Sequence, residues 1–135
     1  MLFRSLLVNG KKARALADTG TIGGTLISNK FITTHNIPYT AKKKPVTLRM
    51  AVKGSRSTSN FDCTAEIQIG KMKIPKVAMM VTPVSDYDVL LSMDDLMKFG
   101  AVIDCRKNTI YFPDHKVRIY CSGKSSHPRS AMAKP

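Results

Sequence analysis

Asp18 is the acidic residue of this chain whose surroundings best suit catalysis. It follows the apolar residues Leu16 and Ala17 and precedes Thr19 and Gly20, so a carboxylate stands on a glycine turn at the end of a predicted strand. Gly20 has no Cβ, which lets backbone N–H groups approach the carboxylate closely. Because Asp-Thr-Gly is also ordinary turn chemistry, the tripeptide alone is a weak signal.

The other acids have simpler explanations. Asp94 and Asp95 fall in the first turn of a predicted helix, where carboxylates stabilise the helix N-terminus. The remaining acids lie in predicted turns or in strands with basic neighbours: Asp62, Glu66, Asp86, Asp88, Asp104 and Asp114.

A single aspartate is a poor catalyst of peptide hydrolysis, because the reaction needs both a general base and a general acid. Two carboxylates about 3 Å apart cannot both ionise, so they share a proton, and one can then take a proton from water while the other hydrogen-bonds the substrate. If Asp18 is one such carboxylate, we expect the second to come from another copy of the chain across a two-fold axis.

Other catalytic chemistries have little support. His35, His115 and His127 are far apart in sequence and have no partner at metal-ligand spacing, and no phosphate-binding glycine loop occurs. We therefore expect no cofactor and no metal. Three widely spaced cysteines, Cys63, Cys105 and Cys121, indicate free thiols in a reducing compartment.

Length and charge limit the remaining classes. A chain of 135 residues with 43% hydrophobic residues suits one globular domain, and it contains no apolar run long enough to cross a membrane. The net charge of +13 favours non-specific attraction to RNA. The basic residues are dispersed along the sequence, however, and only 7% of residues are aromatic, so specific nucleic-acid recognition is not indicated.

The first half of the chain predicts strands around one short helix. Asn9-Gly10 predicts a tight hairpin between residues 3–8 and 13–17. Ser28 suits the N-cap of a helix over residues 29–36, and alternating apolar residues predict a strand over 46–52. Beyond a glycine-centred tip at 53–55, residues 56–60 are polar, as in a mobile return arm.

The second half predicts more strands and a second helix. A hairpin joins residues 61–69 to 72–81, with Pro75 placing the second strand at an edge or delaying its start. A short buried strand over 88–91 precedes a helix capped by Ser92. We expect Asp95 to close a capping box there, Gly100 to end the helix, and three residues to form its apolar face: Leu96, Met97 and Phe99. Strands over 101–105, 109–112 and 115–121 follow, and then a basic tail, 122–135, that we expect to be disordered.

Two stretches resemble the retropepsin family, in particular the proteases of gypsy-class LTR retrotransposons or proteins domesticated from them. They are residues 15–28, ALADTGTIGGTLIS, and residues 87–112, YDVLLSMDDLMKFGAVIDCRKNTIYF. The resemblance extends over residues 1–121. It implies an all-β, retropepsin-like acid-protease fold: a closed β-barrel-like monomer with one or two short helices, active as a two-fold homodimer. The implied function is an aspartic endopeptidase that cleaves its own retroelement polyprotein in the cytoplasm, virus-like particles included.

The same resemblance assigns roles to individual residues. Asp18 would be the catalytic carboxylate, Thr19 would form a hydroxyl contact between the two active-site loops, and Gly20 would offer its backbone to the substrate. Gly54 would be the tip of a flap, with Met50 and Val52 behind it. The substrate-binding set comprises Leu16, Thr21, Ile22, Met50, Val52, Gly54 and Leu90.

The resemblance also implies a dimer sheet built from residues 2–4 and 117–121. The chain departs from the family pattern at Thr21, Ser92 and Asp95, where alanine, glycine and tryptophan are common. Two alternatives stay open at this point. One is a retropepsin-fold module, weakly active or inactive, that serves for dimerisation or peptide binding, and the other is a small basic β-barrel that binds RNA.

Overall fold

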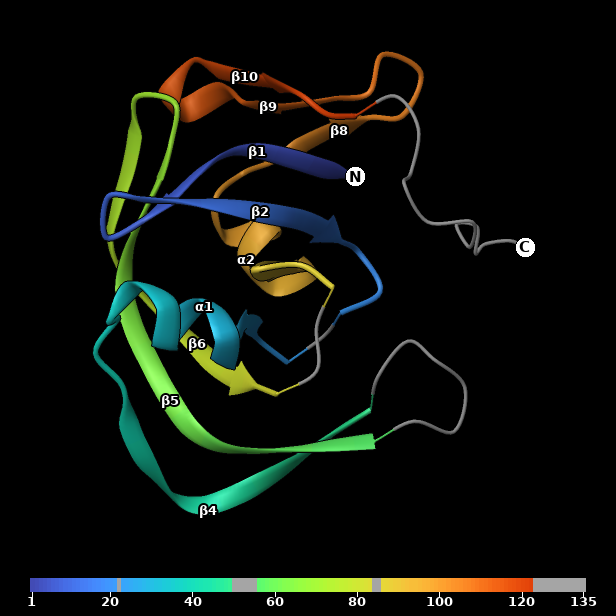
Figure 1. Cartoon of the computed structure of the whole chain (residues 1–135). Coiled ribbons are helices and arrows are strands. Elements are labelled where there is room, and N and C mark those ends of the chain that lie inside the picture. Colours follow the sequence, from blue (N-terminus) through green and yellow to red (C-terminus); the bar gives the residue numbers. More distant parts are fainter. Residues whose placement is uncertain (22, 50–55, 84–85, 123–135) are drawn as a thin grey trace.

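The computed structural model describes residues 1–21, 23–49, 56–83 and 86–122. Ten strands, two short α-helices and one 3-10 turn follow one another along the described chain (Figure 1). The strands are β1 (Leu2–Val8), β2 (Lys11–Asp18), β3 (Thr25–Ser28), β4 (Thr40–Arg49), β5 (Arg56–Ile69), β6 (Met72–Thr82), β7 (Val89–Ser92), β8 (Val102–Asp104), β9 (Thr109–Phe112) and β10 (Val117–Tyr120). The helices are α1 (Asn29–His35) and α2 (Met93–Lys98), and η1 (Pro113–His115) is the 3-10 turn.

Most strands belong to one sheet that closes on itself. Its order is β1-β2-β7-β3-β6-β5-β4, and an additional pairing between β1 and β5 joins the first strand to the sixth. Six strands therefore form a closed barrel, and β4 extends from β5 outside it. A smaller sheet of order β10-β9-β8 lies beside β1 (Figure 1). The predicted all-β, barrel-like fold with short helices is confirmed.

Short-range signals set the first elements. Asn9 and Gly10 both have positive φ, 47° and 81°, as the predicted hairpin turn between β1 and β2 requires. The Ser28 side chain accepts hydrogen bonds from the N–H groups of Lys30 and Phe31, and α1 ends at Asn36 in the left-handed conformation. The predicted helix and its cap are confirmed.

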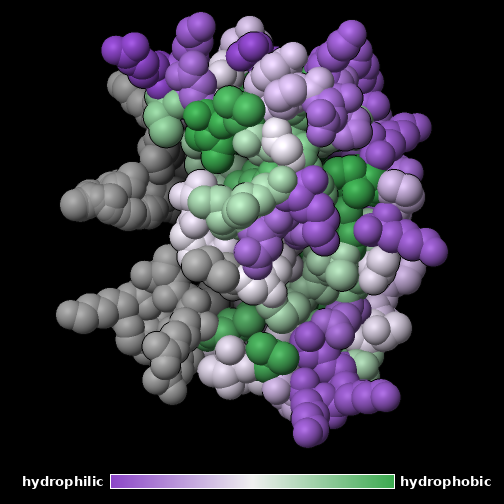
Figure 2. All heavy atoms as spheres, turned by 180° about the vertical axis from the view of Figure 1, so that it is seen from behind, coloured by the Kyte–Doolittle hydropathy of each residue, from purple (hydrophilic) through white to green (hydrophobic). Residues whose placement is uncertain are grey.

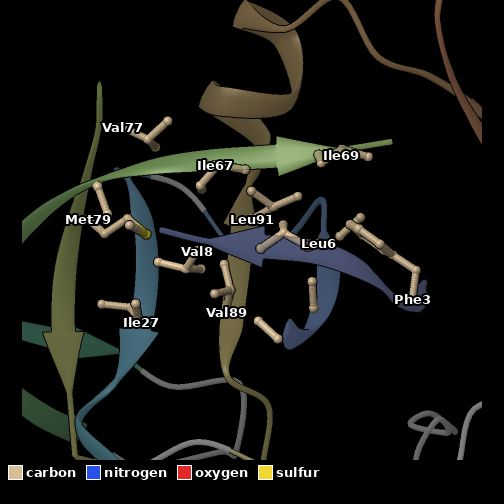
Figure 3. Close-up of a cluster of buried hydrophobic side chains, with 14 of the residues drawn as sticks. Phe3, Leu6, Val8, Ile27, Ile67, Ile69, Val77, Met79, Val89 and Leu91 are labelled. Atoms are coloured by element: carbon tan, nitrogen blue, oxygen red, sulfur yellow. The ribbon is translucent and has the colours of Figure 1, made fainter. Parts of the chain in front are cut away.

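The core fills the barrel with side chains from alternate strand positions. Leu6, Val8, Ile67, Val89 and Leu91 are fully buried and converge from β1, β5 and β7 (Figure 3). Because side chains along a strand alternate between two faces, the residues between these point outward. The buried set therefore fixes which face of each strand is available for a site.

The predicted return arm is confirmed in the described residues, because Arg56–Ser59 on β5 pair with Val46–Arg49 on β4 in an antiparallel hairpin. Both strands are longer than predicted, since β4 starts at Thr40 and residues 56–60 continue into the 14-residue strand β5. Residues 50–55, which include the predicted tip, lie outside the described residues, as do residues 123–135 of the predicted tail.

Pro75 lies within β6, which is an interior strand between β3 and β5. The β5–β6 register shifts by one residue between the Ala65–Val77 and Ile67–Ile74 pairs, so the proline sits at a bulge. β3 pairs only with the later part of β6, from Met79 onward, and so needs no N–H group from Pro75.

Three further expectations about the second half are corrected. Met97 is 71% exposed, so of the three residues predicted for the apolar face only Leu96 and the C-cap residue Phe99 are buried. The last strand is shorter than predicted, because His115 belongs to η1 and β10 runs from Val117 to Tyr120. Asp95 does not close a capping box, since its carboxylate accepts a hydrogen bond from Thr25 on β3.

Candidate active site

Asp18 is the last residue of β2 and is half-buried. Ala15 and Ala17 point into the core, so Leu16 and Asp18 project from the opposite face of the strand. β2 runs parallel to β7, and the register places Asp18 beside Ser92. The carboxylate therefore stands where a strand leaves the barrel, on a rigid support.

Both carboxylate oxygens of Asp18 accept a hydrogen bond from the loop that follows. The Gly20 N–H donates to Oδ1 at 2.9 Å, and the Thr21 hydroxyl donates to Oδ2 at 2.8 Å. A Cβ at position 20 would lie 3.3 Å from Oδ1, which is tighter than an ordinary contact. Glycine at this position thus allows the close approach that the sequence predicted.

Helix α2 holds the loop in place. The Met93 N–H donates to the Thr21 carbonyl at 2.9 Å, and the Gly23 N–H donates to the Asp94 carboxylate at 2.9 Å. Asp94 was explained from sequence as a helix-terminus acid, and the structure shows that it also fastens the loop after Asp18. No pattern in the sequence connects Gly23 with Asp94, because the contact spans 71 residues.

A buried network joins β3, β7 and α2 beneath this loop. The Ser92 N–H donates to Thr25 Oγ1 at 3.1 Å, the Thr25 hydroxyl donates to the Asp95 carboxylate, and the Asp95 N–H donates to Ser92 Oγ at 3.1 Å. Thr25 and Ser92 are both fully buried. Serine at position 92 therefore caps α2 and takes part in a closed network, rather than only filling a place where glycine is common.

Replacing Thr25 by valine should destabilise the protein by about 1–3 kcal/mol, because the Ser92 N–H and the Asp95 carboxylate would both lose a partner. The measurement is the free energy of unfolding in urea. Thr34→Val is a matched control, since Thr34 is exposed on α1, and it should change stability by less than about 0.5 kcal/mol. Equal effects of the two substitutions would show that the network contributes nothing.

The described substrate-binding candidates gather beside Asp18. Leu16 and Leu90 are register partners on β2 and β7, both are half-buried, and each lies two residues before Asp18 or Ser92 on its strand. Thr21 binds the carboxylate directly. The other predicted members of the set lie outside the described residues: Ile22, Met50, Val52 and Gly54.

Nothing in the described part of the chain neutralises Asp18. The one ion pair among the described residues joins Lys42 on β4 to Asp62 on β5 and does not involve Asp18. Within the same residues no group of three or more His, Cys, Asp or Glu side chains is placed to hold a metal ion. Burial raises the pKa of the Cys63 thiol, and that side chain sits in the core away from the carboxylate.

A cavity of about 300 Å³ adjoins the site without containing Asp18. Its lining includes Gly23, Gly24 and Thr25 from the loop and Asp94 and Asp95 from α2.

The strands predicted to form a dimer sheet are engaged within the chain. Leu2 and Phe3 are 5% and 2% exposed, and Val117 and Ile119 are also buried. The Ser122 N–H donates to the Leu2 carbonyl at 2.9 Å, which brings the end of the described chain against β1. Tyr120, at 76% exposure, is an exposed large hydrophobic side chain at the end of β10.

The retroviral aspartyl protease family matches residues 1–117. No curated protein sequence matches the chain. Among solved structures, the retroviral protease-like domain of Ddi1 from Leishmania major superposes with a TM-score of 0.66 at 16% identity, covering 94% of this chain and 98% of that one.

Two further solved structures share the fold. The inhibitor-bound EIAV protease has a TM-score of 0.59 at 17% identity, covering 77% of this chain and 91% of its own. A retropepsin-like aspartic protease from Rickettsia conorii has a TM-score of 0.53 at 22% identity, covering 76% and 75%. At these identities the likeness concerns the fold. In the described residues no helix has both the length and the apolar character needed to span a bilayer.

Proposed function

Because the chain belongs to the retroviral aspartyl protease family, we propose that it is an aspartic endopeptidase whose active site forms between two copies, each supplying Asp18. The observation that carries this proposal is the carboxylate at the end of β2, with its two oxygens oriented by the Gly20 N–H and the Thr21 hydroxyl. In the described residues no second carboxylate bonds to it, and a partner chain would supply one.

The proposed reaction uses one proton shared between two Asp18 side chains. The ionised carboxylate takes a proton from a water molecule, and the resulting hydroxide attacks the peptide carbonyl carbon. The protonated carboxyl gives its proton to the carbonyl oxygen, which forms a tetrahedral diol. The proton taken from water then passes to the amide nitrogen, the C–N bond breaks, and a diol hydroxyl returns a proton to the second carboxylate as the C=O bond re-forms. A doubly protonated pair and a doubly ionised pair are both inactive, so the rate should pass through a maximum on the acid side of neutrality.

The loop residues fit this role. Hydrogen bonds from Gly20 and Thr21 fix the carboxylate, so the oxygens need no reorganisation when water is activated. Thr19 is exposed at the tip of the loop, where it is available for the proposed hydroxyl contact with the partner loop. Leu16 and Leu90 form an apolar surface next to Asp18 that suits an apolar substrate side chain.

For the substrate, we propose the polyprotein of a gypsy-class retroelement that includes this chain. The support comes from residues 15–28 and 87–112, which resemble that class of protease in order and spacing.

The test is turnover of a peptide library, with and without an inhibitor directed at aspartic protease active sites. Cleavage that the inhibitor blocks would support the proposal. Stable peptide binding without cleavage across acid and neutral pH would contradict it, and would favour a dimerisation or peptide-binding module.

Thr21→Val should lower kcat/KM about tenfold, because valine keeps the shape of threonine but cannot donate to Asp18 Oδ2. A hydrogen bond to a charged group is worth about 1.5–3 kcal/mol, and 1.4 kcal/mol corresponds to tenfold in rate. Thr21→Ser keeps the hydroxyl and should stay within about threefold of the parent. If the valine variant matched the serine variant, the hydroxyl would have no part in orienting the carboxylate.

A further inference from the structure

The closed barrel gathers lysines that are dispersed in the sequence. Two hairpins, β1–β2 and β5–β6, meet where β1 pairs with β5, at the left of Figure 1. They carry five exposed lysines, which we call the lysine face: Lys11, Lys12, Lys71, Lys73 and Lys76. The two groups of lysines are about sixty residues apart in the sequence, and the pairing of β1 with β5 brings the two hairpins side by side.

Strand register shows how close the two runs are. Lys12 is the partner of Leu7, Leu7 is the partner of Gln68, and Gln68 is the partner of Lys73. Register partners point to the same face of a sheet. Lys12 and Lys73 are therefore three strand spacings apart, roughly 14 Å at about 4.8 Å per spacing. This separation exceeds the screening length of about 8 Å at physiological salt, so each lysine would act by contacting its own phosphate of a shared strand.

Little negative charge opposes this face. The two hairpins carry three acids, of which Asp18 ends β2 and Asp62 pairs with Lys42 on β4. The third, Glu66 on β5, is half-buried, and its backbone is bonded to Asn9 in the β1–β2 turn. No ion pair engages any of the five lysines in the described part of the chain. Hydrophilic side chains project from the corresponding edge in Figure 2, at the right of that view.

The chemistry favours nucleic acid over a membrane. Each strand of a nucleic acid carries a phosphate about every 3.4 Å of helix axis, so one strand can meet several lysines at once. Lysine is a flexible point charge without a fixed fork, which suits contacts that do not depend on sequence. An interfacial membrane site would need several exposed apolar side chains to insert. Of the exposed large hydrophobic residues of the described chain, Phe61 alone lies on these two hairpins, and it lies on the part of β5 that pairs with β4.

We infer that the lysine face binds the phosphate backbone of single-stranded RNA without sequence preference. β2 begins with Lys11 and ends with Asp18, so the face lies roughly 23 Å from the carboxylate at about 3.3 Å per residue. Bound RNA would leave the carboxylate open. This surface is independent of the proposed proteolysis, and failure of one proposal leaves the other standing.

The experiment measures binding of a fluorescent 20-nucleotide oligouridine by anisotropy over a range of salt concentrations. The test variant is Lys11→Gln, Lys12→Gln, Lys71→Gln and Lys73→Gln together. The control removes the same charge from exposed lysines elsewhere: Lys30→Gln, Lys43→Gln, Lys44→Gln and Lys98→Gln. Urea unfolding of both variants checks that each is folded.

The test variant should bind at least tenfold more weakly near 0.1 M salt, and its salt slope should fall by up to about 3, since each single-strand phosphate contact contributes about 0.7. The control should lose less than threefold. Equal losses would show that net charge rather than the face governs binding, and would overturn the inference. Unchanged binding by the test variant, or tighter binding to phosphatidylserine vesicles than to RNA, would overturn it as well.

Discussion

Asp18→Asn should reduce peptide cleavage by at least about a thousandfold and leave the fold intact. Asparagine has nearly the same size, and its carbonyl oxygen can still accept the hydrogen bond from the Gly20 N–H, while its NH2 group can donate to the Thr21 hydroxyl oxygen. Its amide cannot take a proton from water, and general acid–base catalysis by a positioned group contributes about 10²–10⁴-fold. Since both copies of a dimer would carry the change, the losses at the two carboxylates compound.

The measurement is kcat/KM on the best peptide from the library, with unfolding in urea as a check on folding. Asp104→Asn is a matched control, because Asp104 also ends a strand and accepts N–H bonds from the turn after it, at Arg106 and Lys107. The control should cleave at nearly the parent rate. An Asp18→Asn protein that kept its activity would refute the assignment of this carboxylate.

Mixing Asp18→Asn chains with parent chains should lower the activity of the parent enzyme, because parent chains would form inactive mixed dimers. When one parent chain is co-refolded with four variant chains, random pairing leaves about one fifth of the parent chains with a parent partner, so activity should fall to about one fifth. This result is expected because the proposed active site needs two Asp18 side chains and each chain supplies only one. Co-refolding avoids any dependence on slow subunit exchange.

Titration of the variant ratio at constant parent concentration gives the measurement. Asp104→Asn chains provide the control, because they keep Asp18 and should not lower the rate when mixed in the same way. Activity that stayed constant as variant chains were added would mean that one copy holds the complete catalytic site, and the two-fold arrangement would have to be abandoned.

The turns and helix starts of this chain could be predicted from residues that lie close together in the sequence. Asn9-Gly10 predicted a turn that needs two positive φ angles. Ser28 and Ser92 predicted two helix starts, and each serine side chain accepts hydrogen bonds from N–H groups in the first turn of its helix. The contact between Asp18 and Gly20 is likewise local, because the Gly20 N–H donates to the carboxylate of Asp18, two residues earlier in the chain. Local chemistry of this kind depends on backbone angles and side-chain type at the turn itself.

Contacts across the barrel depended on the tertiary structure. Pairing of β2 with β7 sets Asp18 beside Ser92, and packing of α2 brings Asp94 to Gly23 and Asp95 to Thr25. Closure between β1 and β5 unites lysines that are about sixty residues apart in the chain. The alternation in each strand says which residues face inward, but strand partners and register are selected by burial of the whole apolar set at once. The sequence by itself thus determined the carboxylate and its turn, while the partners that hold that turn and the charge on the far end of the barrel were decided only when the strands closed around a common core.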